Sequence, residues 1–336
     1  MKTIMVTGGA GFIGTNFIKY VLNETDFDGM IINIDMLTYA GNKDNLSDID
    51  DDSRYSFHQL DICDYEDIEG VIQEHNVDTI VNFAAESHVD RSISGPMPFI
   101  QTNIVGTFTL LELAKKYNLR FHQISTDEVF GSIQSGLFTE ESPYAPNSPY
   151  SASKASADHL VRSYNKTYDL PTTISVCTNN YGPYQFPEKL IPVIIHNCLH
   201  RLPIPVYGTG RNVRDWIYVR DNCIAIWSIL QKGTLGDTYC IGGNTEVSNI
   251  NLVEIICEIF DKTLDNTTSS KELITYVEDR AGHDFRYAID SSKLRYELNW
   301  KPEGDFETKL VDTIGWYLMN LDWVDTCLTN QEKVQK

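Results

Sequence analysis

The stretch Val6–Phe17, VTGGAGFIGTNF, decides the fold. It follows a short β-rich run at residues 2–7 and leads into a helical pattern, with Gly8, Gly11 and Gly14 in the turn between them. Glycine permits a tight turn and a close approach of the backbone to a pyrophosphate, whose charge the following helix N-terminus favours. The stretch therefore predicts a dinucleotide-binding turn at the start of a Rossmann-type domain.

An acidic residue supports this prediction. Asp35 ends the second apolar run, 21 residues after Gly14. A carboxylate there binds the ribose diol and repels a 2′-phosphate, so NAD is favoured over NADP. Asp61 ends the third run, where it would meet the adenine edge. A glycine turn without a ligand is the alternative, and it is disfavoured because strand, spacing and acid occur together. We expect NAD to contact Gly8, Gly11, Phe12, Ile13, Gly14, Asp35, Thr38, Asp61, Ile62, Ala84, Tyr150 and Lys154.

The N-terminal half alternates between strand and helix patterns. Apolar runs typical of strands lie at 2–7, 30–34, 55–60, 77–83 and 119–124, and helical patterns lie at 65–75 and 99–117. This alternation predicts an α/β fold with a doubly wound parallel sheet that is covered by helices on both faces. A further helix is expected at 148–168 and a further strand at 172–177.

The pattern becomes less regular after Tyr181-Gly182-Pro183, where proline and glycine recur. We expect short helices at 249–260 and 306–321, within a smaller, interleaved C-terminal lobe that closes a cleft. We predict an NAD-binding Rossmann domain at 1–180, with a returning segment near 210–245, and a substrate-binding lobe at 181–330.

Composition and charge exclude several classes of protein. The 336 residues carry a net charge of −20, which disfavours nucleic acid or an anionic membrane as a partner. The seven cysteines form no CxxC pair and are typical of reduced core residues, so no metal site is expected. Because a strand pattern begins at residue 2, we expect no signal peptide, and no apolar run reaches the roughly 18 residues that span a bilayer. A cytoplasmic location is therefore expected.

Tyr150 and Lys154, in the stretch SPYSASKAS, are four residues apart at the start of a predicted helix. This spacing places both side chains on one face. A nearby ammonium favours a phenolate, which can take the proton of an alcohol as its hydride leaves. By itself this spacing arises often by chance and indicates an exposed pair, but downstream of a dinucleotide turn it indicates an alcohol-dehydrogenase type of site.

The stretch STDEVF, Ser125–Phe130, places two adjacent carboxylates where a strand ends. Ligands bind at strand ends in open α/β sheets, whereas neighbouring acids repel each other and are costly to bury. A solvated turn is the alternative interpretation of this stretch alone.

Several separate motifs give the chain a family resemblance: DMLTYAGN, AAESHVDRSI, STDEVFG, YSASKASAD, NNYGPYQFPEKLIP, NVRDWIYV and AGHDFRYAID. Together they resemble the extended short-chain dehydrogenase/reductase family and, within it, the nucleotide-glucose 4,6-dehydratases, from about residue 2 to 320. The resemblance implies an NAD-dependent lyase of deoxysugar biosynthesis with dTDP-glucose as its substrate. It also implies a homodimer formed through the helices at 99–117 and 148–168.

The resemblance also implies roles for the carboxylates. Such enzymes oxidise the sugar at C4, eliminate water across C5 and C6, and return the hydride to C6. Glu128 would be the base that removes the C5 proton, and Asp127 the acid that protonates the C6 hydroxyl. Thr126 would hydrogen-bond the C4 oxygen beside Tyr150. The catalytic set is therefore Thr126, Asp127, Glu128, Tyr150 and Lys154.

An anionic nucleotide sugar needs local cations in so acidic a protein, and the second half of the chain supplies them. The expected substrate-binding residues are His88, Thr126, Asn180, Glu188, Lys189, Leu190, Tyr207, Arg214, Asn249, Arg280 and His283. For any single charged residue among them, a plain surface role is an equal alternative. His88 is as compatible with a structural role as with proton transfer, so it stays outside the catalytic set.

Departures from the family pattern leave alternatives open. Val176, Thr178, Thr209, Ala281 and Phe285 stand where other residues are usual. Several lie near the nucleotide lobe, so UDP-glucose remains an alternative substrate. A 4-epimerase or decarboxylase of the same family is a rival, although epimerases and GDP-mannose dehydratases typically lack the acid at Asp127. A non-enzymatic NAD-responsive protein is a second rival, which the complete catalytic set disfavours.

Overall fold

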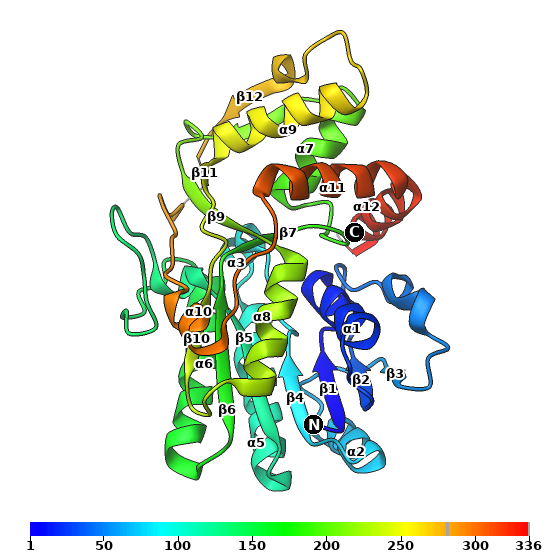
Figure 1. Ribbon diagram of the computed structural model, residues 1–336, viewed down its shortest axis with the longest axis vertical. Helices are drawn as coiled ribbons and strands as arrows, with labels where there is room; N and C mark the ends of the chain where they lie inside the picture. The colour runs from blue at the N-terminus through cyan, green and yellow to red at the C-terminus, as the bar shows by residue number, and fades with distance from the viewer. Residues whose placement is uncertain (280–281, 335–336) are drawn as a thin grey trace.

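The computed structural model describes residues 1–279 and 282–334. At its centre lies a seven-stranded parallel sheet with the order β3-β2-β1-β4-β5-β6-β10 (Figure 1). The strands are β1 (Thr3–Thr7), β2 (Met30–Ile34), β3 (Tyr55–His58), β4 (Thr79–Asn82), β5 (Arg120–Thr126), β6 (Thr172–Cys177) and β10 (Thr238–Ile241). The predicted α/β fold with a doubly wound parallel sheet is confirmed. Because the strand order reverses between β1 and β4, a crevice is expected at the carboxyl ends of these strands.

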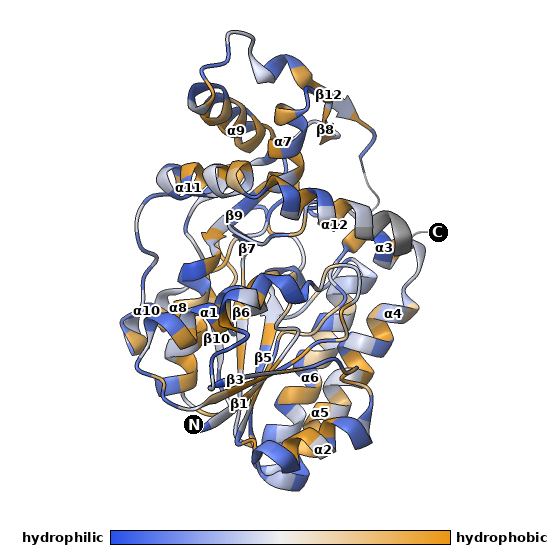
Figure 2. Ribbon diagram, turned by 90° about the vertical axis from the view of Figure 1, so that its right-hand side faces the viewer, coloured by the Kyte–Doolittle hydropathy of each residue, from blue (hydrophilic) through white to orange (hydrophobic). Residues whose placement is uncertain are grey.

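Helices cover both faces of the sheet and bury one apolar core on each. On one face lie α1 (Phe12–Glu24) and α8 (Val219–Lys232), which pack against each other. On the other face lie α2 (Tyr65–His75), α5 (Thr107–Tyr117) and α6 (Pro149–Tyr168). The first core contains Phe17 and Ile226, and the second contains Ile68, Leu110 and Val161. In Figure 2 the apolar stripes of these helices are turned toward the strands.

The single helix expected at 99–117 is divided into three segments. They are α4 (Met97–Phe99), a π-helical segment (Ile100–Gly106) and α5. Within the π-helical segment, Asn103 donates from Nδ2 to the carbonyl of Glu86 (3.0 Å) and to Ser153 Oγ (2.8 Å). π-Helical turns are common near functional sites. Here the segment joins the loop after β4 to α6.

The rest of the chain forms a smaller lobe beyond the carboxyl ends of the strands (Figure 1). It contains β7 (Asn179–Tyr181), β9 (Val213–Tyr218) and β11 (Glu246–Ser248) in one sheet, and β8 (Ile204–Tyr207) and β12 (Ile274–Val277) in another. Its helices are α7 (Leu190–Leu199), α9 (Asn249–Thr263), α11 (Phe306–Met319) and α12 (Leu321–Val334). The helix α12 was not among those expected from the sequence. Two short helices, α3 (Val89–Ser94) and α10 (Ser292–Leu298), lie beside the sheet domain.

Two further observations concern the whole chain. All seven cysteines are free thiols, and all but Cys63 are buried. Within residues 1–279 and 282–334, no helix combines the length and the apolar composition that a bilayer crossing requires.

Candidate active site

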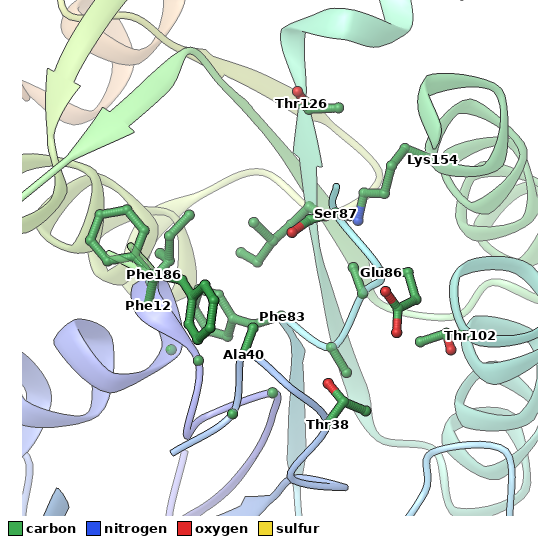
Figure 3. A pocket seen from close by; sticks show the side chains of 18 of the residues that line it. Phe12, Thr38, Ala40, Phe83, Glu86, Ser87, Thr102, Thr126, Lys154 and Phe186 are labelled. Atoms are coloured by element: carbon green, nitrogen blue, oxygen red, sulfur yellow. Dashed lines mark hydrogen bonds between the residues drawn. The ribbon is translucent and has the colours of Figure 1, made fainter. Parts of the chain in front are cut away.

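A cavity of about 340 Å³ lies at the crevice, along the carboxyl ends of β1, β2, β4, β5 and β6. Residues 177–180 and 185–189, which lead into the smaller lobe, complete its wall. Figure 3 shows Thr126 at one end of the cavity, Thr38 at the other, and Lys154 reaching in from α6. The cavity therefore has room for an extended ligand that passes from the second strand to the fifth.

The glycine turn forms the floor of this cavity. Gly8 has φ +70°, and a Cβ built on it would lie 2.6 Å from the backbone nitrogen of Ala84. A Cβ on Gly14 would lie 2.3 Å from the carbonyl oxygen of Gly8. The helix α1 begins at Phe12 without a side-chain cap, so N–H groups of its first turn remain available to a phosphate. The turn thus has the shape that a pyrophosphate requires.

Asp35 is placed to bind a ribose diol. Its Oδ2 accepts a hydrogen bond from the backbone N–H of Ala10 (2.9 Å), and its Oδ1 accepts one from that of Leu37 (2.8 Å). Burial raises the pKa of Asp35, and these two hydrogen bonds oppose that shift. A carboxylate has about four acceptor positions, so roughly two remain for hydroxyl donors.

All twelve residues expected to contact NAD line this one cavity. They come from the glycine turn, from the segments after β2, β3 and β4, and from α6. The residues present therefore fit NAD. Their individual contacts with it stay a prediction.

The expected catalytic residues also meet in the cavity. Thr126 is the last residue of β5, and its Oγ1 accepts a hydrogen bond from the N–H of Glu128 (3.4 Å), which starts the 3₁₀ turn Asp127–Phe130. The helix α6 begins after Ser148, which caps it in a reciprocal pair of bonds with Ser151. That start places Tyr150 and Lys154 on the first turns, facing the same space.

The carboxyl groups of Asp127 and Glu128 are buried to different degrees. Asp127 is only 2% exposed, its Oδ2 has no hydrogen-bond partner in the described structure, and Glu128 is half-buried. Burial, and then the charge of Glu128, raises the pKa of Asp127 well above its usual value. A protonated Asp127 beside a more exposed Glu128 provides one acid and one potential base. The solvated-turn interpretation does not fit a carboxyl this deeply buried.

Lys154 does not by itself lower the pKa of Tyr150. Both side chains are buried, and Lys154 Nζ donates to the carbonyl of Ile124 (2.6 Å). Burial, followed by the charge of Glu128, raises the pKa of Tyr150, while burial lowers that of Lys154. The lowering of the phenol pKa expected from the spacing is therefore wrong as a net direction, because desolvation raises the pKa of Tyr150 and the charge of Glu128 adds to that rise.

The residues expected to bind substrate fall into two groups. Thr126, Asn180, Glu188 and Lys189 line the cavity. His88 and Leu190 flank it: His88 Nε2 lies 3.6 Å from Glu188 Oε2, and Leu190 is the first residue of α7.

The second group lies on the smaller lobe and does not line the cavity. Tyr207 and His283 are ring neighbours at 6.5 Å, and Asn249 is the first residue of α9. Arg214 is buried, donates to the carbonyl of Asp284 (2.9 Å) and lies over the ring of Tyr287 (4.3 Å). Arg280 lies outside the described residues.

Several lining residues were not identified from the sequence. The polar ones among them include Glu86, Ser87, Thr102, Thr178, Asn179 and Gln185. Thr178 Oγ1, Asn180 Oδ1 and Gln185 Oε1 are buried without a partner in the described part of the chain, as expected of groups that await a polar ligand. The residues after β4 and those in the stretch NNYGPYQF could have been identified from the sequence, because both segments follow strand ends, where ligands bind. Thr102 could not, since only the π-helical segment brings it to the cavity.

Comparisons with known proteins agree with this geometry. A family profile described as GDP-mannose 4,6 dehydratase matches residues 5–313. A dTDP-glucose 4,6-dehydratase of Salmonella typhimurium is 50% identical over 342 residues, which cover 96% of this chain and 94% of that protein. The crystal structure of dTDP-glucose 4,6-dehydratase from Bacillus anthracis in complex with NAD matches with a TM-score of 0.89 and 48% identity, covering 97% of this chain and 100% of that chain. DesIV, a dTDP-glucose 4,6-dehydratase of Streptomyces venezuelae solved with NAD and TYD bound, matches with a TM-score of 0.90 and 43% identity, covering 97% and 99%.

The close contacts at Gly14 predict that one added methyl group at this position weakens NAD binding. Gly14→Ala should weaken NAD binding at least about tenfold, because its Cβ would lie 2.3 Å from the carbonyl oxygen of Gly8 and displace the turn. NAD released from the purified, denatured protein measures the effect. Gly70→Ala is the matched control, because nothing lies within 4 Å of its Cβ. Equal NAD content in both variants would contradict the role of the turn.

Proposed function

We propose that this chain, which belongs to the GDP-mannose 4,6 dehydratase family and resembles dTDP-glucose 4,6-dehydratases over nearly its whole length, converts dTDP-glucose into dTDP-4-keto-6-deoxyglucose. It is an NAD-dependent hydro-lyase. The observation that carries this function is the buried Asp127 beside Glu128, in one cavity with Tyr150, Lys154 and the NAD-binding turn. An alcohol oxidation alone would not need the two carboxyls.

The first step removes the hydride of C4 and the proton of the hydroxyl group on C4 of the glucose. Tyr150 takes the proton of the C4 hydroxyl, and Thr126 donates a hydrogen bond to the same oxygen. Bound NAD supplies the hydride acceptor for C4 and the hydride donor for C6. Because burial and Glu128 raise the pKa of Tyr150, its phenolate requires a cationic neighbour, and we assign that part to Lys154, four residues along α6.

The second step eliminates water. The ketone at C4 makes the C5 proton acidic, and Glu128 removes it as a carboxylate. Asp127, whose protonated form is favoured by burial and by the charge of Glu128, gives its proton to the C6 hydroxyl, and that group leaves as water. The resulting C5–C6 double bond then accepts the hydride at C6 and a proton at C5 from Glu128. One water is lost, and the sugar oxidation at C4 is balanced by the reduction at C6.

We also propose which parts of the chain serve each ligand. Residues 1–180, with the returning segment near 210–245, bind NAD, and residues 181–330 bind the nucleotide sugar. Lys189, on the cavity wall, and Arg214, on the smaller lobe, bring positive charge to the diphosphate. The cytoplasm is the proposed location, because a chain with seven free thiols suits a reducing compartment.

The homodimer is a further proposal, supported by exposed apolar side chains on the predicted helices. Met97, Ile100, Val105 and Phe108 are exposed along α4, the π-helical segment and α5. Exposed apolar side chains that gather in this way are typical of protein interfaces. The segment packs against α6, the second helix expected at the dimer interface.

A single charged substitution at the predicted interface tests the dimer. Phe108→Glu should convert the dimer into a monomer at micromolar concentration, because it would bury a carboxylate against the partner. Light scattering measures the mass. Leu264→Glu is the control, since it adds the same charge at an exposed leucine outside these helices and should leave the mass unchanged. A monomeric wild-type protein would refute the proposal.

Solvent deuterium tests the reaction itself. In heavy water without added NAD, purified protein and dTDP-glucose should yield a 4-keto-6-deoxy product with deuterium at C5, because Glu128 exchanges its proton with solvent. Nuclear magnetic resonance identifies the product, and a parallel reaction with UDP-glucose should be slower. A C4 epimer without solvent deuterium would identify an epimerase.

The carboxyl pair predicts a partial reaction in a variant. Asp127→Asn should slow the elimination by about 10²- to 10⁴-fold and leave C4 oxidation intact. The absorbance of NADH should therefore rise when dTDP-glucose is added. Glu141→Gln, at an exposed carboxyl, should behave like the wild type. Normal turnover in Asp127→Asn would exclude Asp127 as the acid.

A further inference from the structure

Residues 36–45, called loop 36–45 below, run from the end of β2 into the first turn of a 3₁₀ helix (Lys43–Ile49) and border the end of the cavity that holds Asp35. Met36, Thr38, Ala40 and Gly41 line the cavity directly. Figure 3 places Thr38 and Ala40 at the end opposite to Thr126. On the proposed function the adenosine half of NAD binds at this end, beside Asp35, so loop 36–45 would lie next to the bound cofactor.

The loop is tied on its inner side to the glycine turn. The carbonyl oxygen of Ala10 accepts hydrogen bonds from Asn42 N (3.0 Å) and from Asn45 Nδ2 (3.1 Å). The N–H of Ala10 in turn donates to Asp35 (2.9 Å). Asn45 is buried, at 3% exposure, so its side chain has little access to water. The position of Asn45 therefore fixes the loop against the cofactor-binding turn.

The loop is tied on its outer side to the last helix of the chain. The indole Nε1–H of Trp323, on α12, donates to Asn45 Oδ1 (2.7 Å). One turn later on α12, Cys327 forms a buried cluster with Tyr39 and Phe186, and Ala40 packs against that cluster. In Figure 1, α12 (red) extends from the smaller lobe toward the blue N-terminal segments. Residues at opposite ends of the sequence thus hold one loop from both sides.

A third contact joins the same loop to the substrate side. The hydroxyl of Tyr39 donates to Glu188 Oε1 (2.9 Å), and the Arg91 guanidinium lies 3.6 Å from the centre of the Tyr39 ring. Tyr39 also packs edge-on against Phe186, with ring centres 5.4 Å apart. Loop 36–45 is consequently held at Tyr39 by the wall of the sugar site and at Asn45 by α12.

We propose that α12 is a strap that retains NAD, and that Trp323 is its positioning residue. By holding Asn45, the indole keeps loop 36–45 closed over the adenosine half of the cofactor. The inference rests on the proposed function, in which the hydride taken from C4 must return to C6 of the same sugar. Release of the reduced cofactor between those steps would strand the reaction at the unsaturated ketone. A strap outside the cavity prevents this release without touching the reacting atoms.

Exchange of bound NAD tests the strap. The purified protein with its bound NAD is mixed with isotopically labelled NAD, and the label retained after rapid gel filtration is followed over time. Trp323→Phe should release NAD about tenfold faster than the wild type, because it leaves a buried amide oxygen without its donor. Turnover of this variant should return to the wild-type rate at saturating added NAD. A general loss of structure would not be rescued in this way.

Two further variants make the test specific. Trp316→Phe removes an indole from the same aromatic cluster, with ring centres 5.1 Å from Trp323, but Trp316 has no bond to loop 36–45 in the described structure. It should release NAD at the wild-type rate. Tyr39→Phe keeps the packing on Phe186, removes the bond to Glu188, and should also release NAD faster. This variant remains informative if Trp323→Phe fails to fold.

The results of these experiments distinguish a failure of the strap proposal from a failure of the proposed function. Equal NAD release by the wild type and Trp323→Phe would overturn the strap and leave the dehydratase intact. Equal release by the wild type and Tyr39→Phe would show that loop 36–45 does not retain NAD, which overturns the strap as well. Equal acceleration by Trp316→Phe and Trp323→Phe would also overturn it, because packing rather than the bond to Asn45 would then hold the cofactor. A wild-type protein that retains NAD but does not dehydrate dTDP-glucose would instead overturn the proposed function.

Discussion

The close passage of the glycine turn past its neighbours is the constraint on which the rest of the structure depends. No side chain fits at Gly8 or Gly14, where a Cβ would approach backbone atoms to 2.6 Å and 2.3 Å. This crowding lets β1, β4 and α1 meet at the switch point of the sheet, where the strand order reverses. That junction determines where the cavity, the first turn of α1 and the carboxylate of Asp35 lie.

The burial of side chains then distinguishes the proposed acid from the proposed base. Two neighbouring carboxyls would share similar pKa values in water, but Asp127 is buried and Glu128 is half-buried, so the acid and the base are separated by environment. The same desolvation acts on Tyr150 and Lys154 in opposite directions, raising the phenol pKa and lowering the ammonium pKa. Among groups as buried as these, a charge interaction is stronger than it is in water.

Remote segments of the chain build one wall of the cavity. Loop 36–45 carries lining residues, and it hydrogen-bonds to Glu188 through Tyr39 and to α12 through Asn45. The cavity wall is therefore built from sequence segments that lie far apart along the chain. Such a wall suits the proposed reaction, in which one cofactor serves both hydride transfers on one sugar.

The sequence by itself determined the features that depend on neighbouring residues: the parallel sheet, the glycine turn, Asp35 and the helical spacing of Tyr150 and Lys154. Glycine spacing and apolar periodicity are local signals, and every residue that they led us to expect at the NAD site lines one cavity. Only the tertiary structure decided which charges are buried. It buried Arg214 over Tyr287, placed Tyr207 and His283 away from the cavity, and brought Trp323 to Asn45. Desolvation and contacts between remote segments depend on how the lobes pack, and no local pattern in the sequence encodes that packing.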